Sequence, residues 1–334
     1  MPIITGRDNV MAIYKEAANS KWVLPCFCSE NLTTTEAILC AVKEYGDEKG
    51  IDNLPIIIAI TCRYDHRTQA AYYTHTRRWD VGLKLFLADL HVLADKDSPY
   101  GKLRIMIHLD HIQFDDDSEL LKWDLGAFSS IMFDASKRPF DENIALTRNF
   151  IRQHGKELLV EGACDEIVDA AGTLRSEPTT PENAERFFKE TGADLIVGNL
   201  GTEHRASAKD LHYLGAQARK IRGRVGTRIV LHGASSVPGD QISDLFSDGV
   251  CKVNLWTTLE RDSSPALFTS MVENAVKVAG ASTVQDLKGR ELLSGKCLSD
   301  GKASIDCFTT VYRQDIIHAR MKNIVDSYLR LWYT

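Results

Sequence analysis

Residues 103–110 read LRIMIHLD, a nearly continuous apolar run that ends in Asp110 and is followed at once by His111. A short run of this kind is typical of a parallel strand that is buried on both faces. Seven more such runs are spread along the chain, with amphipathic stretches between them. The predicted strands cover residues 22–28, 54–61, 103–110, 128–135, 157–164, 193–200, 228–234 and 250–257.

Helical patterns fill the segments between the predicted strands. Helices are expected over residues 33–45, 142–153, 181–190 and 311–332, and around 79–95. Thr33 or Thr34 can cap the start of the first, and Thr180 with Pro181 suits the start of another. Eight consecutive β-then-α units predict a TIM (β/α)8 barrel, with a doubly wound open sheet as the alternative.

The predicted barrel takes up the whole chain. Length alone would permit two domains, but no low-complexity linker divides the sequence, so we expect residues 1–334 to form one barrel domain. Residues 258–310 are longer than one barrel helix and rich in Gly, Ser and Lys. They predict an excursion with a mobile loop, so that the excursion and the last helix together cover about residues 258–334.

The composition excludes several classes of protein. The 334 residues are 44% hydrophobic and carry a net charge of -6, which argues against nucleic acid and anionic membranes as partners. No run reaches the roughly 18 apolar residues of a membrane span. The first ten residues lack the apolar core of a signal peptide, so we expect a cytoplasmic protein. The eight cysteines are scattered, which disfavours a disulfide framework.

Three histidines stand where predicted strands run out. They are His111, His204 and His232, and Asp110 lies beside the first. In a TIM barrel the carboxyl ends of the strands meet at one mouth. Each histidine alone would more often be structural, but three imidazoles with an open fourth position are a usual catalytic zinc arrangement. A carboxylate at such a site can move protons, which makes Asp110 the candidate catalytic residue.

Small and polar residues follow the last two predicted strands. Gly233 and Ser235 come after strand seven, and Asn254 and Thr257 end strand eight. Backbone N–H groups and hydroxyls at these positions of a barrel often bind phosphate. Two tight turns that need Gly and Ser for their geometry would explain the same pattern, and spacing alone does not decide between them.

The chain resembles the class II, zinc-dependent ketose-bisphosphate aldolases of the fructose- and tagatose-bisphosphate type, from its N-terminus to about residue 260. The motifs that carry the resemblance are HLDH at 108–111, SSIMFDASKRPFDENI at 129–144, TGADLIVGNLGTEH at 191–204, VLHGASSVP at 230–238 and GVCKVNL at 249–255. The resemblance implies a TIM barrel, zinc bound by His111, His204 and His232, and proton transfer by Asp110.

The resemblance also assigns residues to the substrate. It implies phosphate contacts from Gly233, Ser235 and Thr257, and it matches Asn254 to the asparagine that holds the dihydroxyacetone-phosphate portion. Thr61 replaces a family serine that lies near the same half of the substrate.

Three further residues are expected behind the site. We interpret His108 as a core histidine or one that orients its neighbours, and Glu161 as supporting the site rather than binding the metal. Lys252 is expected to have a structural or electrostatic role, since class II aldolases need no Schiff-base lysine.

Several positions depart from the family pattern. The family's second acid in VEAELG is Ala163, Arg205 follows the second histidine, Trp256 replaces an aspartate, and Cys28 replaces an asparagine. Arg63, in a rebuilt turn, is either an anion partner or a surface residue. The loop acid that exchanges protons has no clear counterpart, and the candidates are Asp165, Glu166, Asp169 and Glu177.

These departures predict conserved chemistry on an altered substrate. We expect a zinc aldolase that cleaves a ketose phosphate or bisphosphate to dihydroxyacetone phosphate, or a related ketone, and an aldehyde. One alternative is a zinc lyase for a non-phosphorylated or carboxylated ketose, and another is a non-catalytic barrel that binds a sugar phosphate. The resemblance further implies a homodimer or homotetramer and allows a monovalent cation near the phosphate loops.

Overall fold

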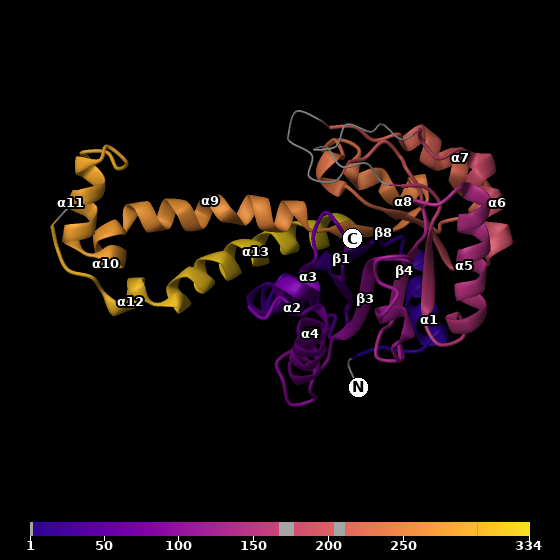
Figure 1. Cartoon of the computed structure of the whole chain (residues 1–334), viewed down its shortest axis with the longest axis horizontal. Coiled ribbons are helices and arrows are strands. Elements are labelled where there is room, and N and C mark those ends of the chain that lie inside the picture. The colour runs from indigo at the N-terminus through magenta and orange to yellow at the C-terminus, as the bar shows by residue number, and fades with distance from the viewer. Residues whose placement is uncertain (1–2, 167–176, 204–210, 299) are drawn as a thin grey trace.

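A closed barrel of eight parallel strands forms the centre of the computed structural model, which describes residues 3–166, 177–203, 211–298 and 300–334 (Figure 1). The strands follow one another around the barrel in chain order. The predicted TIM barrel is thus confirmed, and the open sheet is excluded because β1 pairs with β8. The strands are β1 (Leu24–Cys28), β2 (Pro55–Thr61), β3 (Arg104–Gln113), β4 (Ser130–Asp134), β5 (Leu159–Ala163), β6 (Leu195–Val197), β7 (Ile229–Leu231) and β8 (Val250–Leu255).

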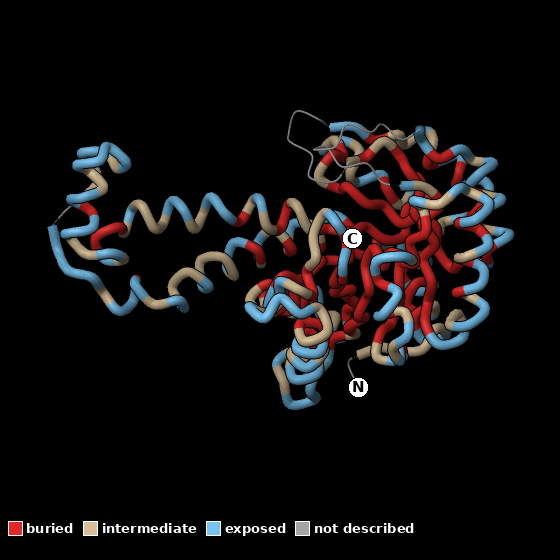
Figure 2. Tube along the Cα trace, viewed as in Figure 1, coloured by how far each residue is buried: buried red, intermediate tan, exposed pale blue. Residues whose placement is uncertain are grey.

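Helices surround the barrel, and buried residues concentrate in the strands and on the inner faces of those helices (Figure 2). The helices before β8 are α1 (Arg7–Asn19), α2 (Leu32–Lys49), α3 (Gln69–Tyr72), α4 (Trp79–Leu93), α5 (Phe140–His154), α6 (Pro181–Thr191), α7 (Gly215–Val225) and α8 (Leu245–Asp248), with 3-10 turns η1 (Leu120–Lys122), η2 (Ala234–Ser236) and η3 (Ile242–Asp244). Within the described residues, no helix is both long and apolar enough to span a bilayer.

Two helix starts test the predicted caps. Thr180 accepts a hydrogen bond from the backbone N–H of Asn183, 3.1 Å away, and so caps α6 as predicted. The cap of α2 is Asn31, whose side chain accepts from the N–H of Thr34. Thr33 and Thr34 instead lie inside the first turn, because the helix begins at Leu32.

The end of β3 is irregular. The register between β3 and β4 shifts between Leu109 and Ile112, and His111 has a φ of 47°. In a regular strand Asp110 and His111 would point to opposite faces of the sheet. A bulge re-aims side chains, and a left-handed backbone at a non-glycine residue is strained enough to occur mainly at functional sites. This bulge lets two adjacent side chains serve one site.

The C-terminal part of the chain forms a helical arm that projects from the barrel (Figure 1). It consists of α9 (Thr257–Glu273), α10 (Ala275–Ala279), α11 (Ala281–Gly289), α12 (Ile305–Phe308) and α13 (Thr310–Trp332). Within the predicted excursion, α9 runs through Pro265 for 17 residues. The second half of α13 returns to the barrel, where Leu329 and Trp332 are buried in its core.

Candidate active site

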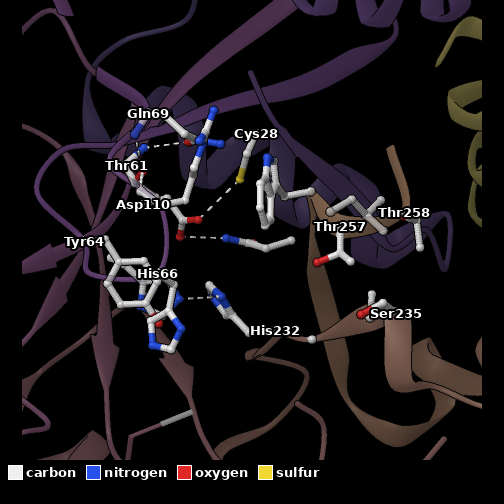
Figure 3. Close-up of a pocket in the computed structure, with 17 residues that line it drawn as sticks. Cys28, Thr61, Tyr64, His66, Gln69, Asp110, His232, Ser235, Thr257 and Thr258 are labelled. Atoms are coloured by element: carbon white, nitrogen blue, oxygen red, sulfur yellow. Dashed lines mark hydrogen bonds between the residues drawn. The ribbon is translucent and has the colours of Figure 1, made fainter. Parts of the chain in front are cut away.

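A pocket opens at the carboxyl ends of the strands (Figure 3). Asp110 lies between its two ends: Ser235 and Thr257 are on one side, and Thr61 and Gln69 are on the other. We call these the β7–β8 end and the β1–β2 end. The described residues that line the pocket are Cys28, Thr61, Tyr64, His66, Arg67, Gln69, Asp110, His111, His232, Gly233, Ala234, Ser235, Asn254, Leu255, Trp256, Thr257 and Thr258.

Asp110 is buried and held by two neighbours. Its Oδ1 accepts a hydrogen bond from Asn254 Nδ2 at 2.8 Å, and its Oδ2 lies 3.4 Å from the thiol of Cys28. Burial raises the pKa of Asp110, but the nearby rings of His111 and His108 more than offset this and hold the pKa well below 3.8. Burial likewise keeps the pKa of the Cys28 thiol high, so the thiol donates to a carboxylate that stays ionised at neutral pH.

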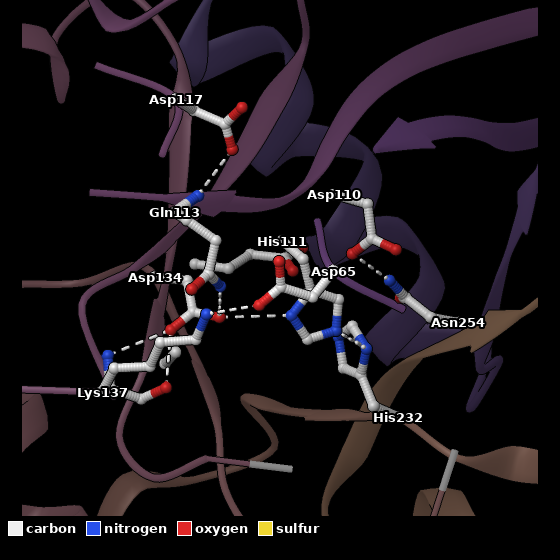
Figure 4. A network of polar contacts seen from close by, with 12 residues as sticks. Asp65, Asp110, His111, Gln113, Asp117, Asp134, Lys137, His232 and Asn254 are labelled. Carbon is white, nitrogen blue, oxygen red and sulfur yellow. Dashed lines mark hydrogen bonds and ion pairs between the residues drawn. The ribbon is translucent and has the colours of Figure 1, made fainter. Parts of the chain in front are cut away.

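His111 and His232 contact each other close to Asp110. His111 Nε2 lies 3.0 Å from His232 Nδ1, and on the other side of the ring His111 Nδ1 lies 3.3 Å from Asp134 Oδ2 (Figure 4). One atom each of Asp110, His111 and His232 lie within 4.8 Å of one another, a grouping that could hold a metal ion. The third predicted ligand, His204, lies outside the described residues, as do Arg205 and the loop candidate Asp169.

A buried polar layer lies beneath the pocket. Lys252 Nζ donates to both oxygens of Glu161, at 2.7 and 2.9 Å, and lies 3.0 Å from His108 Nε2. The other nitrogen of His108 contacts Ser130 Oγ at 2.8 Å, and the ring is 3.7 Å from Asp110. Glu161 is fully buried, and its carboxylate forms an ion pair with Lys252. This layer therefore supports Asp110 from below.

The β7–β8 end carries donors suited to an anion. Gly233 has a φ of 68°, and a Cβ there would come within 2.9 Å of backbone atoms of Glu203. Ser235 Oγ, which can donate, is buried without a hydrogen-bond partner among the described residues. Thr257 opens α9, whose first backbone N–H groups have no partner within the helix and favour negative charge.

At the β1–β2 end, the polar groups bind one another. The Thr61 hydroxyl donates to the carbonyl of Arg67 and accepts from the N–H of Gln69 at 3.1 Å. Arg67 contacts both carboxylate oxygens of Glu30, with Nε 2.9 Å from each. Glu30 also accepts from the indole N–H of Trp256 at 2.8 Å. Both hydrogen bonds of the Thr61 hydroxyl are therefore made within the protein, to the loop that follows β2.

Sequence reasoning missed the residues that pack around His111. Tyr64 stacks on the His111 ring with centroids 4.1 Å apart, and Asp134 anchors its Nδ1. Asp134 could have been noticed as a carboxylate ending a predicted strand, whereas the stacking of Tyr64 has no signal in sequence. Arg63, left open above, pairs with Glu119 at 2.5 Å and does not line the pocket.

The remaining candidates for the loop acid are not among the described residues that line the pocket around Asp110. Asp165 accepts a hydrogen bond from Thr179 at 2.6 Å, and Glu166 lines a neighbouring cavity that shares the wall formed by Tyr64 and His111. The backbone carbonyl of Glu177 accepts from Asn199, 3.3 Å away. None of these contacts selects one of the acids.

Comparison of the sequence with known proteins finds similarity to aldolases. The sequence matches the family described as fructose-bisphosphate aldolase class-II over residues 8–302. It is 34% identical over 181 residues to the D-tagatose-1,6-bisphosphate aldolase subunit GatY of Klebsiella oxytoca, covering 52% of this chain and 62% of that one. It is 28% identical over 251 residues to a fructose-bisphosphate aldolase of Geobacillus stearothermophilus, covering 72% of this chain and 78% of that one.

Solved structures show the same architecture. The fructose-bisphosphate aldolase of Campylobacter jejuni superposes with a TM-score of 0.73 at 16% identity, covering 99% of this chain and 96% of that one. The YdjI aldolase of Escherichia coli K12 gives 0.63 at 19% identity, covering 96% of this chain and 94% of that one. At these identities the likeness shows the fold alone.

Proposed function

Since the chain belongs to the class II fructose-bisphosphate aldolase family, we propose that it is a zinc-dependent aldolase. It would reversibly cleave a ketose phosphate into dihydroxyacetone phosphate, or a related ketone, and an aldehyde. The observation that carries this proposal is the grouping of Asp110 with the imidazoles of His111 and His232 at one barrel mouth.

The donor set at the mouth fits a zinc ion. His111 and His232 would hold it together with His204, and zinc favours imidazole nitrogen. The carboxylate of Asp134 fixes the ring of His111, as carboxylates commonly do for histidines that bind metals. When bound, the ion would polarise the ketone carbonyl and stabilise the negative charge that develops as the carbon–carbon bond breaks.

Asp110 would be the proton acceptor. Its low pKa keeps it charged, and Asn254 holds one oxygen so that the carboxylate has a fixed direction. In cleavage it would take the proton from the hydroxyl whose carbon becomes the aldehyde, and in condensation it would return that proton. The layer formed by His108, Lys252 and Glu161 would keep Asp110 in place.

The β7–β8 end would bind the phosphate. The unpartnered hydroxyl of Ser235, the close backbone approach at Gly233 and the start of α9 at Thr257 support this role. Asn254 would hold the ketone half beside Asp110. The predicted role of Thr61 in substrate binding has less support, because its hydroxyl is already hydrogen-bonded on both sides.

A panel of ketose phosphates tests the proposal. Each sugar is incubated with the protein and zinc, and the release of dihydroxyacetone phosphate is followed through a coupled reduction. Turnover of at least one ketose phosphate is expected. If the sugars raise the melting temperature but none is cleaved, the chain is a sugar-phosphate binder rather than an enzyme. Cleavage of unphosphorylated ketoses alone would favour the diverged lyase.

The remaining expectations extend this proposal. The partner would be a small sugar phosphate, and the assembly a homodimer or homotetramer, which light scattering would measure. A monovalent cation would sit near the phosphate, and replacing K⁺ by a bulky organic cation in the assay would reveal it. A cytoplasmic location agrees with such a substrate.

A further inference from the structure

The two ends of the pocket differ in charge and in free hydrogen-bonding groups. With the phosphate at the β7–β8 end and the reacting carbons beside Asp110, the aldehyde portion of the substrate must extend toward the β1–β2 end (Figure 3). This placement depends on the function proposed above. The side chains at the β1–β2 end therefore decide which aldehyde the protein accepts.

The positive charge at this end is neutralised. Arg67 is the only arginine or lysine among the described residues that line the pocket. Its guanidinium is bound to Glu30, which is 7% exposed and faces the arginine with both oxygens. A bidentate pair of this kind is the geometry an arginine would otherwise offer to a phosphate or carboxylate.

Glu30 is held in place by further partners. It accepts hydrogen bonds from the indole N–H of Trp256 at 2.8 Å and from the side-chain amide of Gln69 at 3.3 Å. A second carboxylate, Glu260 on α9, acts on Arg67 through its charge. An anionic group that enters here would therefore have to displace Glu30 from Arg67.

The other groups at this end offer no anion site. The Thr61 hydroxyl and the backbone N–H of Gln69 bind within the loop. The thiol of Cys28 points at Asp110, and the ring of Tyr64 stacks on His111. The lining also includes the indole of Trp256 and the imidazole of His66, whose ring lies 4.7 Å from that of Tyr64. The thiol is uncharged, because burial raises the pKa of Cys28.

We infer that the β1–β2 end accepts an uncharged aldehyde, so that the substrate is a ketose monophosphate rather than a bisphosphate or a carboxylated ketose. The network of Glu30, Arg67 and Trp256 would be the specificity determinant, because it neutralises the one arginine or lysine of the described lining.

Aldol condensation measures this preference directly. Dihydroxyacetone phosphate is combined with glyceraldehyde, glyceraldehyde 3-phosphate or succinic semialdehyde. The bond forms between carbon 3 of the ketone and the aldehyde carbon; the ketone carbon loses a proton and the new hydroxyl gains one. We expect kcat/KM for glyceraldehyde to exceed that for either anionic aldehyde by at least about tenfold. A preference for an anionic aldehyde would overturn the inference.

A charge substitution tests the mechanism of selection. Glu30→Gln keeps the size of the side chain and one acceptor oxygen, which can serve Trp256, but removes the negative charge that is paired with the guanidinium of Arg67. The ratio of kcat/KM for glyceraldehyde 3-phosphate to that for glyceraldehyde should rise by about tenfold. The control is Glu119→Gln, which removes the exposed partner of Arg63 outside the pocket and should leave the ratio unchanged.

The outcomes separate the two proposals. If Glu30→Gln does not fold, Glu260→Gln removes the second carboxylate and should shift the ratio in the same direction by a smaller factor. An unchanged ratio in the folded variant would overturn the role of the network. If no aldehyde condenses at all, the proposed aldolase function fails and the inference fails with it. If condensation occurs but anionic aldehydes are preferred, the inference fails while the proposed aldolase function stands.

Discussion

Asp110 lies between the two ends of the pocket, where Asn254 and Cys28 contact its carboxylate. Replacing it with asparagine keeps the shape of the side chain but removes the proton acceptor. We expect Asp110→Asn to lower kcat by about 10³-fold, within the usual range for a lost general base. The coupled cleavage assay measures this effect, with the exposed Asp115→Asn as control.

The metal content of the same variant separates two roles of Asp110. Because we assign the ion to the histidines, Asp110→Asn should retain about one zinc per chain. Elemental analysis of the purified variant gives the answer. A variant that is inactive because it has lost its zinc would make Asp110 a ligand, and one with normal turnover would remove it from the mechanism.

Glu260 is a second residue with a shifted pKa. Burial and the charge of Glu30 raise its pKa from 4.5 to about 7. Between these values the folded protein binds more protons than the unfolded chain, so this group's contribution to stability falls as pH rises from 4.5 through 7. The free energy of unfolding of Glu260→Gln, taken relative to that of the wild type, should therefore rise by about 2–3 kcal/mol when the pH is raised from 5 to 8.

Urea unfolding of both proteins at pH 5 and pH 8 measures this difference. Glu119→Gln, which removes an exposed carboxylate paired with Arg63, is the control for the loss of a negative charge. If the difference between Glu260→Gln and the wild type is the same at both pH values, the carboxyl group of Glu260 has an ordinary pKa.

At the residue scale the sequence located the groups that stand at strand ends. Asp110, His111 and His232 were found in this way, because parallel strands bring their carboxyl ends together. The hydrogen bonds of Thr61 and the pair formed by Arg67 and Glu30 were not foreseen, because they depend on how the loop after β2 folds back. Their partners are set by packing rather than by spacing.

At the scale of single elements, irregular backbone was harder to predict from the sequence than regular strands. The bulge in β3 brings His111 to the same side as Asp110, and no sequence pattern predicts this bulge. Strand positions were predictable because the apolar runs are short and separated by helices. Helix α9 was not, because its Ser-rich sequence and internal Pro265 lack a strong apolar stripe.

The turn after β7 gives a prediction at this scale. A Cβ on Gly233 would clash with the backbone of Glu203, and its φ of 68° disfavours other residues. Gly233→Ala should raise the KM for dihydroxyacetone phosphate in condensation at least about tenfold and cost about 1–3 kcal/mol of stability. Gly239→Ala, at an open position in the same loop, is the control. Equal effects at both positions would refute a specific role for Gly233.

At the scale of the whole molecule, the C-terminal helix joins the arm to the barrel. Leu329 on α13 is fully buried in the barrel's core, whereas Leu298 in the arm is 76% exposed. We expect Leu329→Ala to lower the free energy of unfolding by about 2–5 kcal/mol and Leu298→Ala by less than about 0.5 kcal/mol. Urea unfolding measures both. A small loss at Leu329 would mean that the barrel is stable without this helix.

The central claim is that a metal ion and Asp110 together cleave a ketose phosphate, and its most direct test is the release of dihydroxyacetone phosphate before and after removal of metal. The account predicts that a chelator abolishes cleavage, that about one equivalent of zinc per chain restores it, and that magnesium does not. Cleavage that continues unchanged in chelated protein, verified to be free of zinc, would contradict it.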